Sequence, residues 1–528
     1  MDIDLKLLDC TLRDGGYIND WKWDFQRARN IILMLVKAGI DIVEVGFLRN
    51  VEQYDENITV CNRIEELNRL LPKEKCKTKF AAMFMCSNYD IDKLSEYNGH
   101  GIEMLRITAH DYDIDKGLEY ARKAMQKNYK VSINPINIMG YTDRQILDII
   151  DNVNKIHPYQ FAIVDTFGSM KKKDLSRIVS LVDHNLEPDI RLALHLHENM
   201  SMSFCLAQEF VDYHLNRPIS IDASLMGIGR IPGNLPMELI SDNLNDYYDK
   251  NYVIDYMMDA IQDYISPLKK ENAWGYTPAY FLAARYNLHR NYAEHYLAKG
   301  DLTHRDINYI LSKFSDSKKT VFDASYADMV YEQYKNNSID DSEDRSRLQG
   351  RLADREILII APGKTIIDYR SDIKNYIDAK NPVVISVNFV PDDYSADYIF
   401  LSNNRRLEIL DKIDCETILT SNIPDVSKNE CDYQIDYNSL CSSFEFGCNG
   451  LIMLLKLLED FNISKVAIAG ADGYLENDDN YYNSSIRNYS VHGEKFNHSV
   501  SKAINSMTIG IRFLTPTQYS IDKGVIDE

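Results

Sequence analysis

The chain has 528 residues, enough for two or three domains that each bury a hydrophobic core. Its 45% hydrophobic and 26% charged residues are ordinary for a globular protein. The net charge of −21 argues against a nucleic-acid or anionic-membrane partner, because such polyanions bind clustered Lys and Arg. Nine cysteines without a CxxC pair favour a reducing compartment, and neither a signal peptide nor an apolar run of about 18 residues is recognisable. We therefore expect a cytoplasmic protein without a membrane span.

Eight short apolar runs occur at regular intervals in the first half of the chain. Each is too short for a helix and rich in Val, Ile, Leu and Phe, as buried parallel strands are. The runs are Lys6–Thr11, Ile42–Phe47, Lys79–Met85, Met104–Thr108, Lys130–Asn134, Phe161–Asp165, Arg191–His197 and Ser220–Leu225. Amphipathic stretches separate them, such as Phe25–Ala38, which ends at Gly39. Eight strands alternating with helices predict a (β/α)8 TIM barrel over residues 1–250, since the alternative, a doubly wound open sheet, usually has fewer strands.

The rest of the chain divides into three predicted parts. Residues 251–335 form a helical extension, and the charge-dense residues 336–354 form a polar linker or an exposed helix. Residues 355–528 contain the apolar runs EILIIAPG, NPVVISVNF, DYIFLS, ETILTS and SKVAIAGAD, with the helical pattern GCNGLIMLLKLLEDF before the last. This alternation predicts a separate Rossmann-like α/β domain.

Three predicted strand ends carry residues that can bind a metal. Asp14 follows the first strand, His195 and His197 end the seventh, and Asn234 follows the eighth. Alternate residues of a strand face the same way, so both imidazoles point to one place. The first, seventh and eighth strands are neighbours in a closed barrel, and their carboxyl ends meet at its mouth. Two imidazoles and one carboxylate hold a divalent cation and leave other positions open.

Each of these signals has an ordinary reading when taken alone. An HxH pair is more often two unremarkable histidines, and an Arg-Asp pair is usually a surface ion pair. Fe(II) oxygenases use a similar ligand set, but with an HxD spacing on a β-sandwich. The coincidence of all three signals at adjacent strand ends favours a metal site.

The segments LLDCTLRDGG, VEVGF, VDTFGSM, LHLHEN and GIGRIPGN, with NLHRNYAEHYL in the helical extension, carry a specific resemblance. The first ~335 residues resemble the DRE-TIM metallolyase (HMG-CoA lyase-like) superfamily, and most of all its 4-hydroxy-2-oxovalerate aldolase branch. The resemblance implies that Asp14, His195 and His197 bind Mn²⁺ or Mg²⁺ and that Asn234 lies near the metal. It also implies that Arg13 is the catalytic arginine, which stabilises the enolate of a 2-oxo acid such as pyruvate.

Cleavage of a 4-hydroxy-2-oxo acid also needs a base that removes the proton of the 4-hydroxyl group, and two residues are candidates. The aldolase branch has a histidine where this chain has Tyr17, and His110, after the fourth strand, is a second candidate. Tyr292 matches a tyrosine of the family that borders the pocket. Claisen-type synthases of the same superfamily, which use acetyl-CoA, are the alternative. Those usually have Glu or Gln after the RDG motif, where this chain has Gly16 and Tyr17.

The C-terminal domain resembles bacterial sialyltransferase-like domains, which bind CMP-sugars. The segments IIAPGK, ISVNF, DYIF, FGCNGLIMLLKLLEDFNISKVAIAGADGY, FNHSVSKAINSM and FLTP carry this loose resemblance. It implies a cytidine nucleotide-sugar near Gly363, Asn388 and Gly470, with His498 as catalytic base. Lys364 stands where that family prefers Ser.

Together the two resemblances suggest an aldolase that joins a 2-oxo acid to an aldehyde or aldose in surface-glycan synthesis. The alternative for the second domain is a non-catalytic assembly module. We expect the chain to form a homo-oligomer.

Overall fold

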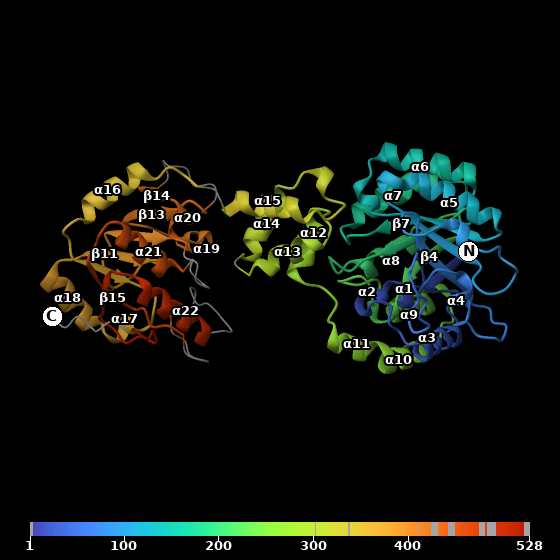
Figure 1. Cartoon of the computed structure of the whole chain (residues 1–528), viewed down its shortest axis with the longest axis horizontal. Coiled ribbons are helices and arrows are strands. Elements are labelled where there is room, and N and C mark those ends of the chain that lie inside the picture. Colours follow the sequence, from blue (N-terminus) through green and yellow to red (C-terminus); the bar gives the residue numbers. More distant parts are fainter. Residues whose placement is uncertain are drawn as a thin grey trace. The chain divides into compact units, whose positions relative to one another are not determined.

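The computed structural model describes residues 4–300, 302–335, 338–410, 412–423, 431–441, 449–474, 481–482 and 493–521. The chain forms two compact units, residues 1–327 and residues 328–528 (Figure 1). Each unit is built on a parallel β-sheet and has its own hydrophobic core.

The first unit is a closed barrel of eight parallel strands. In spatial order the strands run β1-β9-β8-β7-β6-β5-β4-β2, and the pairing of β1 with β2 closes the ring. The barrel strands are β1 (Leu5–Asp9), β2 (Ile42–Leu48), β4 (Lys79–Met85), β5 (Met104–Ala109), β6 (Lys130–Pro135), β7 (Gln160–Asp165), β8 (Arg191–Leu196) and β9 (Ile219–Ala223). All eight predicted strands are confirmed. A two-residue strand, β3 (Val60–Cys61), pairs with the carboxyl end of β2 and was not predicted.

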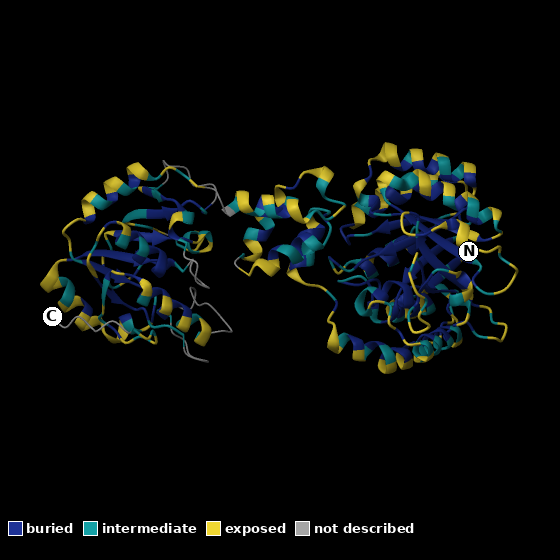
Figure 2. Ribbon diagram, viewed as in Figure 1, coloured by how far each residue is buried: buried dark blue, intermediate teal, exposed yellow. Residues whose placement is uncertain are grey.

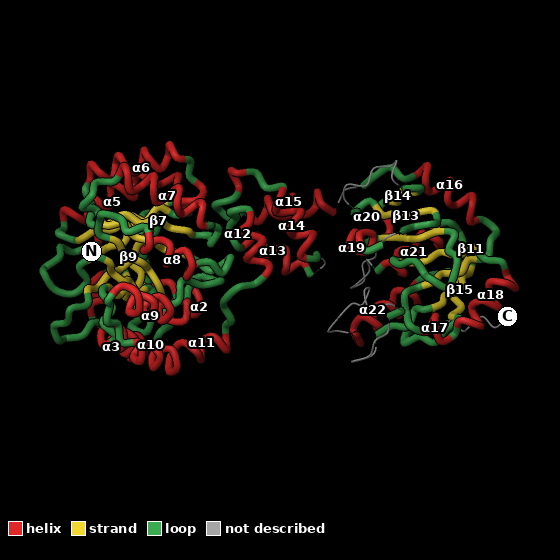
Figure 3. The backbone as a smooth tube through the Cα atoms, turned by 180° about the vertical axis from the view of Figure 1, so that it is seen from behind, coloured by secondary structure: helices red, strands yellow, loops and turns green. Residues whose placement is uncertain are grey.

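Helices surround the barrel, as the tube in Figure 3 shows from behind. They are α3 (Phe25–Lys37), α4 (Ile64–Asn68), α5 (Ile114–Gln126), α6 (Asp143–Ile156), α7 (Lys172–Asn185), α8 (Ser203–Asp212) and α9 (Met237–Tyr248), and the short helices α1 (Thr11–Asp14) and α2 (Gly16–Asn19) follow β1. Figure 2 shows buried strands and helices whose exposed residues face outward. Some of these helices have a side-chain cap at the start; in α3 the Asp24 carboxylate accepts hydrogen bonds from the amides of Gln26 and Arg27.

A helical extension follows the barrel. Its helices are α10 (Ile254–Ala260), α11 (Ser266–Glu271), α12 (Pro278–Arg285), α13 (Asn291–Lys299), α14 (His304–Ser312) and α15 (Ala324–Lys335). The first of these, α10, packs on α3. Farther along, the rings of Tyr292 and Tyr296 pack against Phe314 to form a small aromatic core. The division between the two units falls inside α15.

The second unit is a seven-stranded parallel sheet in the order β14-β13-β12-β11-β10-β15-β16. Its strands are β10 (Ile357–Ile360), β11 (Val383–Val387), β12 (Tyr398–Leu401), β13 (Glu416–Thr420), β14 (Tyr433–Ile435), β15 (Lys465–Ala469) and β16 (Gly510–Phe513). Its helices are α16 (Ser342–Leu352), α17 (Thr365–Asp368), α18 (Arg370–Lys380), α19 (Asn404–Glu408), α20 (Tyr437–Leu440), α21 (Gly450–Asp460) and α22 (Gly493–Ser506). The strand order reverses between β10 and β15, so the predicted second α/β domain is confirmed.

The segment predicted as a polar linker or an exposed helix contains α16. Leu348 and Leu352 of this helix are fully buried in the core of the second unit, and Asp344 accepts a hydrogen bond from the amide of Gln434 in β14. Most of residues 336–354 therefore belongs to the second unit instead of linking the two. Among the described residues, no helix combines the length and hydropathy that a membrane crossing needs.

Candidate metal centre

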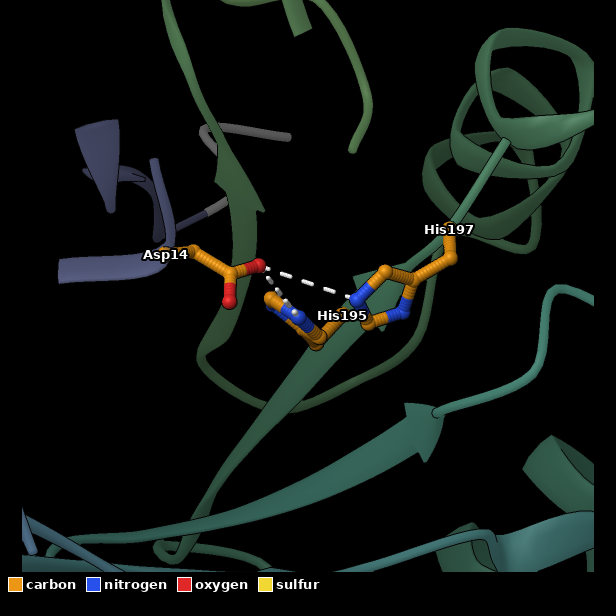
Figure 4. A group of neighbouring side chains, drawn as sticks. All are labelled: Asp14, His195 and His197. Carbon is orange, nitrogen blue, oxygen red and sulfur yellow. Dashed lines mark ion pairs between the residues drawn. The ribbon is translucent and has the colours of Figure 1, made fainter. Parts of the chain in front are cut away.

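Three side chains from the carboxyl ends of β1 and β8, two strands separated only by β9, meet at the mouth of the barrel. Asp14 lies in α1, directly after β1, while His195 lies in β8 and His197 directly after it (Figure 4). The Oδ2 atom of Asp14 lies 3.8 Å from Nε2 of His195 and 3.6 Å from Nε2 of His197. One ligand atom from each residue falls within 4.8 Å of the other two, a spacing that can hold a metal ion. The predicted convergence of these three residues is confirmed.

The hydrogen bonds of the two imidazoles leave the correct nitrogen free for a metal. The Nδ1 atom of His197 lies 2.9 Å from the carbonyl oxygen of Asp165, to which it must donate. The Nδ1 atom of His195 lies 3.1 Å from Oδ2 of Asp222. Each Nε2 therefore keeps a lone pair directed at Asp14. Such partners fix both the tautomer and the orientation of a metal-binding histidine.

Two buried oxygens at this place have no hydrogen-bond partner among the described residues, Oδ2 of Asp14 and Oδ1 of Asn234. Asn234 is buried, and its residue pairs with His197 through an isolated antiparallel bridge. A Cβ atom on Gly229 would lie only 3.1 Å from Oδ2 of Asp14, so glycine keeps the space beside that oxygen open. Unpaired buried oxygens are costly, and a cation would satisfy both. The donor set and its surroundings fit a divalent metal.

Arg13 joins the candidate metal ligands to a buried network of charges. Its Nη1 donates to Oδ1 of Asp14 and its Nε donates to Oε2 of Glu44, and each of the two donor–acceptor distances is 2.7 Å. Burial alone would raise the pKa of Asp14, but the Arg13 guanidinium and the two imidazoles outweigh burial and hold that pKa well below its usual range. Asp14 is thus a permanent carboxylate, and Arg13 a permanent cation beside it.

The network continues through Arg106 on β5. Its Nη1 donates to Oε2 of Glu44 over 3.0 Å, and its Nη2 donates to Asp222, the partner of His195. The side chains of Arg106, Glu44 and Asp222 are all fully buried. A continuous chain of ion pairs therefore links the Arg13 guanidinium to the His195 imidazole.

Sequence reasoning did not identify Glu44, Arg106 and Asp222. A signal for them exists: each is a single charged residue inside an apolar strand, in IVEVGFL, MLRITA and ISIDA. A lone charge at such a position must face a partner inside the barrel, because an unpaired buried charge is strongly unfavourable.

The two candidate bases lie at the same end of the barrel. The ring of Tyr17 packs against Trp21, and the Arg230 guanidinium lies 5.9 Å from its centre. His110 follows β5 and stacks on Tyr112, whose hydroxyl lies 3.1 Å from Nδ1 of His110. Burial lowers the pKa of His110, so its ring is uncharged at neutral pH.

Tyr292 does not reach the metal centre with its hydroxyl. That hydroxyl donates to the carbonyl groups of Lys318 and Val321 and accepts a hydrogen bond from the amide of Asp323. Its ring is fully buried in the aromatic core of the extension. The geometry gives Tyr292 a structural place, while the neighbouring His289 contacts Arg230 at the barrel mouth.

In the second unit, the residues predicted to bind a nucleotide lie at carboxyl ends of the sheet strands. Gly363 follows β10, Asn388 follows β11 and Gly470 follows β15. The turn after Gly363 is already occupied by a carboxylate of the chain, because Asp472 accepts hydrogen bonds from the amide and hydroxyl of Thr365. A Cβ on Gly363 would lie 2.3 Å from that carboxylate. His498 lies exposed on α22.

Comparisons with known proteins bear on the barrel. Residues 4–248 match the HMGL-like family model. Over 238 residues the chain is 23% identical to a 4-hydroxy-2-oxovalerate aldolase of Comamonas testosteroni, covering 44% of this chain and 66% of that protein. It is 22% identical to an oxaloacetate decarboxylase of Mycobacterium tuberculosis, covering 44% and 68%. The chain thus spans about two thirds of the length of these relatives.

Among solved structures, the carboxyl transferase domain of Rhizobium etli pyruvate carboxylase aligns with a TM-score of 0.47 and 12% identity. The alignment covers 65% of this chain and 64% of that one. The family match and the curated relatives thus make residues 4–248 an HMGL-like region with distant similarity to 4-hydroxy-2-oxovalerate aldolases.

Proposed function

We propose that the barrel is a divalent-metal-dependent aldolase that makes or breaks a carbon–carbon bond through the enolate of a 2-oxo acid such as pyruvate. The observation that carries the proposal is the group Asp14, His195 and His197, with the Arg13 guanidinium bonded to Asp14. The HMGL-like match and the aldolase relatives support the same chemistry.

A divalent cation held by Asp14, His195 and His197 would act as a Lewis acid toward the oxygens of a 2-oxo acid. Arg13 adds a fixed positive charge at the place where negative charge develops on the enolate oxygen. Its guanidinium is held by Asp14 and Glu44, so no reorganisation is needed when that charge appears. The hydrogen bonds of Arg106 and Asp222 connect the Arg13 side chain to the His195 imidazole and so hold the two side chains in fixed relative positions.

A proton must also leave the hydroxyl group of the aldol when the carbon–carbon bond breaks. We assign this step to Tyr17 or His110. Tyr17 stands three residues after Asp14, at the same end of the barrel as the candidate metal ligands. His110 is uncharged at neutral pH because burial lowers its pKa, so it can accept a proton.

The test of this proposal is exchange of the pyruvate methyl protons with solvent deuterium, followed by NMR with Mn²⁺ or Mg²⁺ present. Exchange reports enolate formation without knowledge of the aldehyde. We expect the full chain to exchange these protons and His195→Ala to lose both the exchange and the bound metal. The control His100→Ala, at an exposed histidine, should keep the exchange and the metal. Absence of exchange in a folded, metal-loaded protein would refute enolate chemistry.

Two related activities share the enolate and need their own assays. The oxaloacetate decarboxylase relative favours loss of CO2 from a 2-oxo diacid, which forms the same enolate. A Claisen-type synthase would instead condense acetyl-CoA with the 2-oxo acid. Product analysis by mass spectrometry with oxaloacetate, with acetyl-CoA, and with pyruvate plus a panel of aldehydes separates the three.

For the second unit, the resemblance to CMP-sugar enzymes stays a prediction, and with it a role in surface-glycan synthesis. The occupied turn beside Gly363 argues against a phosphate at that one position. Titration of the chain with CMP decides between a nucleotide-binding domain and an assembly module. Binding that His498→Ala leaves intact while it abolishes transfer would support a catalytic role for that histidine.

A further inference from the structure

Arg230 lies between the candidate metal centre and the helical extension. It follows Gly229, the residue whose missing side chain leaves space beside Oδ2 of Asp14. Its guanidinium donates to the imidazole of His289 in the extension and lies 5.9 Å from the centre of the Tyr17 ring. Arg230 thus stands at the mouth of the barrel, where a second substrate must enter to meet the enolate.

The charge of Arg230 is not neutralised by the protein. Within the part of the chain that the structure describes, Arg230 forms no ion pair with a carboxylate. Two carboxylates act on it from longer range, but each has another partner: Asp14 holds Arg13, and Glu294 accepts a hydrogen bond from Tyr280. Burial lowers the pKa of Arg230, which reflects the cost of holding this cation away from water.

In the helical extension, His289 and Arg290 lie close to Arg230. Burial, together with Arg230 and Arg290, lowers the pKa of His289 to about 3, so that imidazole is neutral at pH 7. Arg290 donates through Nη1 to the carbonyl oxygen of Ile231 and forms a long ion pair of 3.9 Å with Glu294, while its buried Nε has no partner among the described residues. His110 is close enough to act on His289 as well: a proton on His110 would lower the pKa of His289 further. A half-buried cation that is not paired with a carboxylate, beside further donors, can bind an anionic group of a ligand.

We propose that Arg230, assisted by Arg290, is an anion subsite that binds a carboxylate or phosphate group on the aldehyde substrate. The inference rests on the proposed aldolase function and adds the class of electrophile, an aldehyde with an anionic group. The 2-oxo acid has its own partners in Arg13 and the candidate metal ligands. Arg230 reaches away from those residues toward the extension, so its anion belongs to the other reactant.

Paired aldehydes test the proposal. Succinic semialdehyde is compared with butanal, and D-glyceraldehyde 3-phosphate with D-glyceraldehyde, each with pyruvate and Mn²⁺. We expect Arg230→Met to lower kcat/KM for the charged member of the preferred pair about 10- to 100-fold, the size of one charged hydrogen bond, and to leave its neutral member unchanged. Arg230→Lys should retain part of the preference, and Arg144→Met, at a surface arginine, should behave as wild type.

Two further measurements separate this inference from the aldolase proposal. Exchange of the pyruvate methyl protons should be the same in Arg230→Met as in wild type, and its loss would assign Arg230 to pyruvate and overturn the subsite. Titration with succinate and with inorganic phosphate by calorimetry needs no turnover, and one of the two should bind more weakly to Arg230→Met. Equal binding to both proteins, or equal loss with charged and neutral aldehydes, would overturn the subsite even if wild type exchanges pyruvate normally.

Discussion

The guanidinium of Arg13 contacts two buried carboxylates at once, and lysine cannot reproduce this arrangement. Arg13→Lys keeps the positive charge but loses the planar fork, while Asp14, His195 and His197 remain. We expect near-normal metal binding and a loss of pyruvate proton exchange of about 100-fold or more, as for removal of one oxyanion donor. Metal analysis and NMR exchange measure the two effects. Arg144→Lys is the matched control, and wild-type exchange in Arg13→Lys would make Arg13 structural only.

The candidate metal ligands were predictable one by one, because their residue types and their places at strand ends are visible in the sequence. Asp14, His195 and His197 come together as predicted. Tyr292 shows the limit of the same reasoning. Its position in a motif suggested a pocket residue, but the direction of its hydroxyl depends on how α13 packs against the loop at Lys318–Asp323.

At the scale of elements, the side chain of one arginine connects three strands of the barrel by ion pairs. Arg106 on β5 pairs with Glu44 on β2 and Asp222 on β9, and all three side chains are fully buried. Arg106→Met removes the cation shared by two buried carboxylates and leaves Glu44 only Arg13 and Asp222 only His195, so we expect the free energy of unfolding of the first unit to fall by about 3–5 kcal/mol. Urea unfolding followed by tryptophan fluorescence measures this unit within the full chain, because Trp21, Trp23 and Trp274 all lie in it.

The control is Arg144→Met, at an arginine whose side chain is 82% exposed, which should change stability by less than about 1 kcal/mol. An Arg106→Met protein as stable as wild type would show that Glu44 and Asp222 find other partners or become protonated. The pH dependence of stability below neutrality also depends on these ion pairs. Burial alone would raise the pKa of Asp222, but Arg106 and His195 outweigh burial and lower it. Its stabilising contribution is therefore present above pH ~4 and is lost as the pH falls further.

At the scale of the whole molecule, the two units predict where the chain can be divided. Residues 338–528 keep α16, whereas residues 355–528 lose Leu348 and Leu352 from the core of the second unit. Burial of a leucine contributes about 1.5–3 kcal/mol, so we expect the shorter fragment to be about 3–6 kcal/mol less stable. Urea unfolding followed by circular dichroism compares the two fragments. Equal stabilities would mean that α16 only lies on the surface of the unit.

The separate first unit gives the complementary result. Residues 1–335 contain the barrel, the extension and every residue of the candidate metal centre. This fragment should exchange pyruvate methyl protons at the rate of the full chain. A rate that falls to background in a folded fragment would show that the second unit takes part in the barrel chemistry.

Local sequence determined most of the fold. The eight barrel strands and five strands of the second sheet were predictable, because short apolar runs between caps and turns report buried parallel strands without any tertiary information. Strand β14 was missed because it has only three residues, and β16 because its sequence GIRF is not an apolar run and is only partly buried. Helix α16 was read as a linker because its sequence is dominated by charge, and only two buried leucines reveal the face that packs.

The sequence by itself therefore determined the barrel, the second α/β unit and the types and strand positions of the metal-binding residues. Tertiary structure alone decided how their charges are paired. The buried polar network from Arg13 to His195 joins α1 and four strands, from position 13 to position 222, and no local pattern connects its members. The unpaired charge of Arg230 is likewise invisible until the extension folds over the barrel mouth. A local sequence records where a charge stands, but which charges meet depends on the closure of the barrel.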